Sequence, residues 1–230
     1  MARQKGIIKI AGTLGDVTFV ESKTYGAHTR AARGTHKEAG INGVLQGNAD
    51  KASKIGPLGS LILRQLKTIE KGFVPGDLWP RMTSRMFKAK SMKKEDLLQS
   101  LKGIELNERY QFWKLFSALP VLGISVKNSR LLIEIELLSH PHFSREVKAS
   151  QYLSEVSVLF LDGKGGCMKD VMETEWILFD EELGVYEMAF MVPKGAKYFL
   201  VVEGVKGGRD GKEAESFLGR GFRIGGWGKF

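Results

Sequence analysis

The segment VLGISVKNSRLLIEIELL, residues 121–138, contains two runs of aliphatic residues separated by a short polar turn. The runs are Val121–Lys127 and Arg130–Leu138, and the turn is Asn128-Ser129. Two such runs joined by a two-residue turn are the sequence pattern of a β-hairpin. The segment therefore predicts a pair of antiparallel strands.

More strand-like segments follow this hairpin at regular spacing, separated by turns rich in glycine and proline. The expected strands are Tyr152–Leu161, Glu175–Phe179, Val185–Val192, Tyr198–Val205 and Ser216–Ile224. Together with the first pair they make about seven short strands, which is typical of an antiparallel β-sandwich of immunoglobulin-like size. The Cys…Trp…Cys pattern of true immunoglobulin domains is absent, so the sequence predicts the architecture and no named superfamily.

The residues ahead of the strands predict helices. Apolar side chains recur at helical spacing between residues 57 and 71, which predicts one helix with a single apolar face. Those side chains are Leu58, Leu61, Ile62, Leu66 and Ile69. Leu78–Lys90 and Ser91–Leu101 predict a second and a third helix. Thr35–Asn48 has three glycines and little periodicity, so we expect a loop or an extended arm there.

The N-terminal segment Gly6–Gly34, GIIKIAGTLGDVTFVESKTYGAHTRAARG, predicts a β-hairpin or a three-stranded meander. Apolar and polar residues alternate over Val17–Ser22, and a glycine-rich turn lies before them. A hairpin is marginally stable by itself. We therefore expect it to pack on the apolar face of the Leu58–Ile69 helix or on another molecule.

These elements predict an α+β fold that is mainly β. An N-terminal hairpin or meander with two or three helices occupies residues 1–102, and an antiparallel immunoglobulin-like β-sandwich occupies residues 103–230. No apolar stretch reaches the about 20 residues of a membrane helix, and the N-terminal apolar run is too short for a signal peptide. Residence in the cytoplasm is the default expectation, with later release or non-classical export left open.

The net charge of +9 is unevenly distributed along the chain. Residues 1–94 carry 18 Lys and Arg against 6 Asp and Glu, whereas residues 95–230 carry 17 against 20. This asymmetry indicates an acidic partner for the first half, either nucleic acid or an acidic surface on another copy of the chain. The alternative is a set of solvated surface lysines.

The densest positive run lies in the second and third expected helices. It consists of Arg81, Arg85, Lys88, Lys90, Lys93 and Lys94. Basic residues at helical spacing are typical of a surface that contacts a phosphate backbone. They are also typical of a solvated amphipathic helix face, and the sequence leaves both interpretations open.

The first third of the chain resembles a family of uncharacterised bacterial proteins that begin with KGIIKL, continue into a GT(I/L)GD(I/L)TF hairpin, and end in a β-rich part. The matching positions are Lys5–Ile10, Gly12–Phe19, Gly26, Arg30, Arg33–Gly34, Ala52–Lys54 and Leu63–Leu66. The family has no assigned activity, so the resemblance transfers no catalytic residue. It implies a compact N-terminal module joined to a more variable β domain.

Motifs that carry chemistry are missing from the sequence. G-x-S-x-G, H-E-x-x-H, G-x-x-x-x-G-K-[ST] and C-x-x-C do not occur, so we expect no enzyme, no catalytic residue and no cofactor. Cys167 lies in a glycine-rich turn and is interpreted as a structural thiol. His140 and His142 flank a proline, but a stable zinc site needs three or four ligands, so we expect no metal.

The sequence is best explained by a non-enzymatic structural or assembly subunit. We expect it to associate with other copies of itself in a larger bacterial assembly of a filamentous or phage-like kind. The expected contact residues lie at both ends of the chain: Ile7, Ile8, Ile10, Val17, Phe19, Trp227 and Phe230. The alternatives are a nucleic-acid-binding protein that uses the basic residues of 1–94, and a sandwich whose ligand site the sequence does not disclose.

Overall fold

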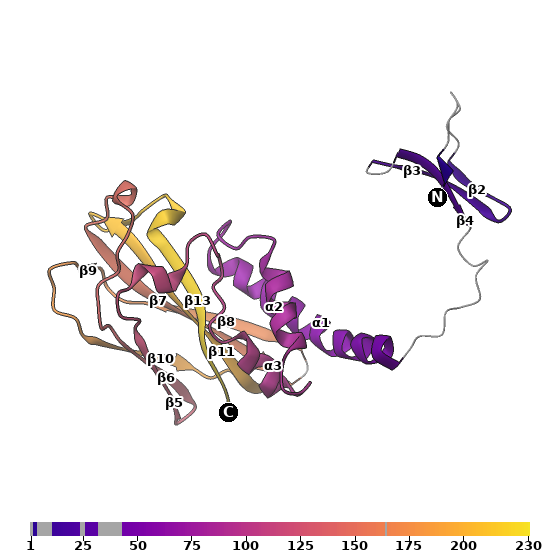
Figure 1. The fold of residues 1–230 in the computed structure, drawn as a ribbon. Coiled ribbons are helices and arrows are strands. Elements are labelled where there is room, and N and C mark those ends of the chain that lie inside the picture. Colours follow the sequence, from indigo (N-terminus) through magenta and orange to yellow (C-terminus); the bar gives the residue numbers. More distant parts are fainter. Residues whose placement is uncertain (1, 4–10, 24–25, 32–42, 164) are drawn as a thin grey trace. The chain divides into compact units, whose positions relative to one another are not determined.

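The computed structural model describes residues 2–3, 11–23, 26–31, 43–163 and 165–230. The chain forms two compact units, residues 1–48 and residues 49–230. Figure 1 shows the elements of each unit. The predicted residues Ile7, Ile8 and Ile10 lie outside the described residues.

Three helices precede the strands of the sandwich: α1 (Gly43–Ile69), α2 (Leu78–Phe87) and α3 (Lys94–Leu101). The sequence predicts the first helix near residues 57–71, whereas α1 begins at Gly43 and contains Pro57. The part of the expected arm that falls in residues 43–48 is also helical. Residues 43–54 are all exposed, so this end of α1 lacks the apolar periodicity from which a helix is recognised.

The smaller sheet of the sandwich contains β5 (Val121–Lys127), β6 (Arg130–Glu136) and β10 (Val185–Met191), in the order β10-β6-β5. All its pairs are antiparallel. Asn128 and Ser129 connect β5 to β6 with φ of 50° and 59°. Positive φ at both central residues is the requirement of a tight two-residue hairpin turn, so the hairpin predicted from residues 121–138 is confirmed.

The larger sheet contains four long strands in the order β13-β11-β7-β8. They are β7 (Gln151–Asp162), β8 (Cys167–Glu173), β11 (Ala196–Arg209) and β13 (Arg220–Lys229), with the short β9 (Ile177–Leu178) beside β7 and β12 (Lys212–Glu213) beside β11. The sequence did not predict β8, since five of its seven residues are exposed and their polarity hides the strand pattern.

The two sheets pack face to face as an immunoglobulin-like β-sandwich, which confirms the predicted fold class. The chain runs through β5 and β6 in the smaller sheet, β7 and β8 in the larger, β10 in the smaller, and β11 and β13 in the larger. The shared core is apolar and aromatic. It includes Leu131, Ile133, Ile135 and Phe190 from the smaller sheet and Val156, Val158, Phe160 and Val201 from the larger.

The opposite face of the larger sheet is covered by the three helices, which makes a third layer (Figure 1). Side chains of α1, α2 and α3 share one core with side chains of β7, β11 and β13. This core includes Ile62, Leu66, Met82 and Leu98 from the helices and Leu159, Leu200, Val202, Phe222 and Ile224 from the strands. The central strands β7 and β11 are therefore buried on both faces along most of their length.

The predicted domain boundary differs from the division between the two compact units. We predicted a division between residues 102 and 103, but the compact units divide at residues 48 and 49. Backbone hydrogen bonds join the segment after α3 to β13, since Gly103 N donates to Ile224 O (2.7 Å) and Leu106 N donates to Phe222 O (2.8 Å). The apolar face of α1 packs on the larger sheet, so the helices belong with the sandwich.

Buried charged groups lie where the end of α1 meets the larger sheet. Lys206 Nζ is 2.8 Å from Glu155 Oε2, 2.9 Å from Glu173 Oε1 and 3.2 Å from Glu213 Oε1. Arg220 forms ion pairs with Glu70 and Glu213. The cluster fastens β7, β8, β11, β12 and the start of β13 to the residue that follows α1.

The N-terminal unit contains a four-stranded antiparallel sheet in the order β1-β4-β3-β2. Its strands are β1 (Ala2–Arg3), β2 (Gly12–Leu14), β3 (Val17–Ser22) and β4 (Gly26–Ala31). Leu14 pairs with Val17 across the turn Gly15-Asp16, in which Gly15 has a φ of 58°. Among residues 11–23, 26–30 and 43–48, only His28 is buried.

Candidate functional site

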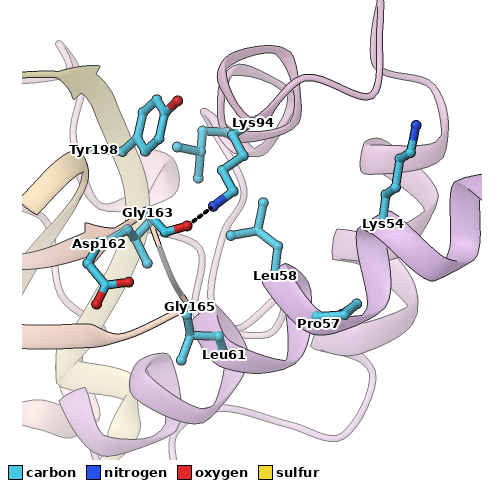
Figure 2. A pocket seen from close by; sticks show the side chains of 11 residues that line it. Lys54, Pro57, Leu58, Leu61, Lys94, Asp162, Gly163, Gly165 and Tyr198 are labelled. Atoms are coloured by element: carbon cyan, nitrogen blue, oxygen red, sulfur yellow. Dashed lines mark hydrogen bonds between the residues drawn. The ribbon is translucent and has the colours of Figure 1, made fainter.

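A cleft opens between α1, the start of α3 and the loop that joins β7 to β8 (Figure 2). Its volume is about 280 Å³. Most of its wall is apolar. The side chains that form this wall are Pro57, Leu58 and Leu61 of α1, Leu98 of α3, Leu161 of β7 and the ring of Tyr198 of β11.

The charged groups that line the cleft are two lysines and the carboxylate of Asp162 at the end of β7. Lys54 is exposed and lies one helical turn before Leu58 on α1. Lys94 begins α3, and its Nζ donates a hydrogen bond to the Gly163 carbonyl oxygen at 3.3 Å (Figure 2). The cleft thus combines an apolar wall with two ammonium groups and one carboxylate. The excess of positive charge suits a guest that carries an aliphatic side chain next to a carboxylate.

Hydrogen bonds hold the remaining polar groups of the cleft in place. Tyr198 Oη donates to Glu95 Oε1 at 3.1 Å, and burial together with this bond raises the pKa of Tyr198. Asp162 Oδ1 accepts a hydrogen bond from Gly166 N at 2.6 Å, which shapes the β7–β8 turn. These contacts give Tyr198 and Asp162 structural roles.

The six basic residues predicted as one patch do not share one role. Arg81 donates to the carbonyl oxygens of Glu105 (2.7 Å) and Leu106 (3.2 Å), and Arg85 donates to the carbonyl oxygen of Lys102 (3.0 Å). These guanidinium groups fasten α2 to the segment that follows α3. Lys88, Lys90 and Lys93 are exposed, whereas Lys94 belongs to the cleft.

The residues predicted to contact other copies differ in how much of their surface is exposed. On β3, Val17 is 40% exposed and Phe19 is partly exposed. Of the predicted C-terminal contact residues, Trp227 lies in β13 and Phe230 follows this strand. Both contact their own chain, and Phe230 remains 37% exposed. Trp227 Nε1 donates to Gln99 Oε1, and the ring centroid of Phe230 lies 5.1 Å from that of Phe199.

His140, His142 and Cys167 are the residues considered from the sequence as candidates for metal binding or catalysis. His140 Nδ1 lies 3.0 Å from Tyr152 Oη, while His142 is exposed. Within the part of the chain that the structure describes, no group of three or more His, Cys, Asp or Glu side chains is placed to hold a metal ion. Burial raises the pKa of Cys167 to about 11, so this thiol is protonated at neutral pH.

The sequence did not predict the cleft, although it drew attention to several of its residues. Leu58 and Leu61 belong to the recognised apolar stripe, and Lys94 belongs to the recognised basic run. The β7–β8 loop is what brings them into one site, and a loop contact of that kind has no signature in a single sequence.

Among the described residues, no helix has both the length and the apolar character needed to span a membrane. The predicted cytoplasmic location stays a prediction.

No protein-family model and no curated protein matches the chain. Among solved structures, the chicken interferon gamma receptor alpha chain is similar to it, with 14% identity over 48% of this chain and 47% of the receptor chain. The match therefore spans about half the length of each protein. Its TM-score is 0.24. The sandwich is defined by the strand order and by the core that its two sheets share.

Proposed function

We propose that this protein is a non-enzymatic structural subunit that associates with other copies of itself through its N-terminal sheet. The observation that carries the proposal is the exposure of apolar side chains on this sheet. Leu14 is 77% exposed and Val17 is 40% exposed. A small sheet needs an apolar face packed against other structure to be stable in water, and only His28 is buried among its described side chains.

The apolar face of α1 supports the proposal indirectly. The sequence predicts that the N-terminal hairpin packs on this face or on another molecule. Ile62 and Leu66 of this face are fully buried in the core that α1 shares with the larger sheet. In our proposal, a second molecule therefore covers Leu14 and Val17. Burial of an aliphatic side chain contributes about 1.5–3 kcal/mol, which makes such a contact favourable.

The charge distribution supports contacts between unlike surfaces. The first 94 residues have a net charge of +12, as 18 Lys and Arg minus 6 Asp and Glu, and the remainder has −3, as 17 minus 20. Unlike surfaces that meet head to tail form rings when the rotation closes and filaments when it does not.

The proposal is tested by comparing the whole chain with a variant that lacks residues 1–48. Size-exclusion chromatography with light scattering over a range of protein concentrations measures the mass, and electron microscopy shows the particles. We expect the whole chain to grow beyond the monomer mass as concentration rises and the shortened chain to remain monomeric. A whole chain that stays monomeric at every concentration and at low salt would overturn the proposal.

A further inference from the structure

The turn between β2 and β3 presents an apolar tip with a carboxylate beside it. Leu14 and Val17 are direct cross-strand partners on either side of Gly15-Asp16. At 77%, Leu14 has the largest exposed fraction of any large apolar side chain in the described residues. Asp16 is exposed at the same turn. A side chain as apolar as leucine gains free energy when a partner surface removes it from water.

The cleft described above has the complementary properties. Leu58, Leu61 and Leu98 offer an apolar wall. The positive charges of Lys54 and Lys94 outnumber the negative charge of Asp162 in the lining. A cavity of about 150 Å³ is enough to hold a benzene molecule. The cleft measures about 280 Å³ and therefore has room for the side chains of both Leu14 and Val17.

We propose that the β2–β3 tip of one copy docks into this cleft of a second copy. Leu14 and Val17 enter the apolar part, and the positive charges of Lys54 and Lys94 attract the carboxylate of Asp16. The inference rests on the proposed function and names the two surfaces that meet. Because tip and cleft are different surfaces of the same chain, each added copy leaves one tip and one cleft unused, and the assembly grows head to tail.

The opposite charges of tip and cleft make the association depend on ionic strength. Opposite charges at a contact speed the encounter of the two surfaces and disfavour wrong partners. Pairs at an exposed rim are screened by salt. The association is therefore faster at low ionic strength, while the burial of Leu14 keeps the assembled state from dissociating entirely at high ionic strength.

Two variants separate the tip from the cleft. Leu14→Ser removes the apolar group from the tip, and the double change Lys54→Glu with Lys94→Glu reverses the charge of the cleft. The Leu14→Ser variant is expected to associate about 10- to 100-fold more weakly than the unmodified chain, the range that corresponds to one buried leucine. The charge-reversed variant is expected to associate about 10-fold more weakly or worse, because two glutamates repel Asp16. The matched control is Lys51→Glu with Lys93→Glu, which makes the same charge change at neighbouring exposed positions and leaves association unchanged.

Mixing the variants identifies the geometry of the contact. The Leu14→Ser chain keeps an intact cleft, and the double Lys→Glu chain keeps an intact tip, so a 1:1 mixture is expected to stop at a pair of chains. Light scattering measures the mass of each sample, and circular dichroism checks that each variant is folded. In a second mixture, Asp16→Lys with the double Lys→Glu variant is expected to regain association by exchange of charges.

The experiments test self-association separately from the contact between tip and cleft. If the unmodified chain is monomeric, the proposed function fails. If the unmodified chain assembles and both variants assemble equally well, the tip-and-cleft contact is wrong while self-association stands. If the 1:1 mixture remains monomeric although the unmodified chain assembles, the tip and the cleft do not meet between copies, and the inference is overturned.

Discussion

Lys206 Nζ lies 2.8 Å from Glu155 Oε2, and the side chains of the two residues are only 8% and 3% exposed. Burial raises the pKa of the Glu155 carboxyl, and the Lys206 ammonium acts in the opposite direction. Burial alone would lower the pKa of Lys206, but the Glu155 carboxylate raises it. The Lys206 ammonium and the Glu155 carboxylate therefore stabilise each other's charged form in this buried position.

Replacing Lys206 by Met should lower the free energy of unfolding by about 3–5 kcal/mol at neutral pH, since it leaves Glu155 buried without a counter-charge. The folded-state pKa of Glu155 should then rise further, because the lysine that lowered it is gone. A carboxyl with a raised folded-state pKa binds its proton more tightly in the folded protein, so the penalty should shrink as pH falls through that pKa. Urea unfolding at several pH values measures this, and Lys194→Met, at an exposed position, is the control. A loss below 1 kcal/mol at neutral pH would contradict the prediction.

Glu134 and Glu187 are direct cross-strand partners in β6 and β10, and both are exposed on the outer face of the smaller sheet. Like charges directly opposite each other destabilise a sheet. Glu187→Lys should therefore raise the free energy of unfolding by about 0.2–1 kcal/mol, and the gain should fall with added salt. The comparison is Glu182→Lys in the exposed turn before β10, which should leave stability unchanged. An equal gain in both variants would point to net charge as the cause.

Cys167 should react slowly with iodoacetamide in the folded protein. Its pKa is raised by burial from 9.0 to about 11, so the thiolate is about 100-fold scarcer at pH 8. The greater nucleophilicity of a more basic thiolate offsets part of this effect, and we expect a rate about 10-fold below that of free cysteine. The rate should keep rising with pH up to about 11. Denaturation in urea should restore the free-cysteine rate, and a native rate that already equals it would disprove the shift.

The segment 49–230 should fold without residues 1–48, because its helices and sheets share their cores within that segment. The strands alone, residues 120–230, should not. Removing the helices exposes Leu200, Val202, Phe222 and Ile224, which are 0 or 1% exposed in the whole unit. Circular dichroism during heating should show a cooperative transition for 49–230 only. A matching transition in 120–230 would mean that the helical layer is dispensable.

Local rules predicted much of this fold. The two-residue turn at Asn128-Ser129 and the strands around it follow from turn chemistry and aliphatic runs, and both are present. Strand β8 was missed because residues at the edge of a sheet, such as Met168 and Asp170, are exposed and need not alternate. The first turns of α1 were missed because an exposed helix has no apolar face to recognise.

The contacts between distant segments could not be predicted from the sequence. An apolar stripe such as Leu61, Ile62 and Leu66 shows that a helix is covered, but it does not show which element covers it. From the sequence, the stripe is paired with the N-terminal hairpin, and another molecule is kept as the alternative partner of that hairpin. The observed partners, Leu200 and Phe222, lie far along the chain. The cleft depends on the same long-range arrangement, so only its separate residues could be recognised beforehand.

The helical layer over β7, β11 and β13 also has a consequence for the time course of folding. α1, α2 and α3 are made before any strand that they cover, and the last of these strands, β13, ends at Lys229. Contacts between segments so distant in sequence form slowly. Until they form, the apolar sides of three helices and of two central strands are open to wrong partners. The kinetics of refolding in this unit should therefore be limited by the docking of the helices, and aggregation should compete with that step as the concentration rises.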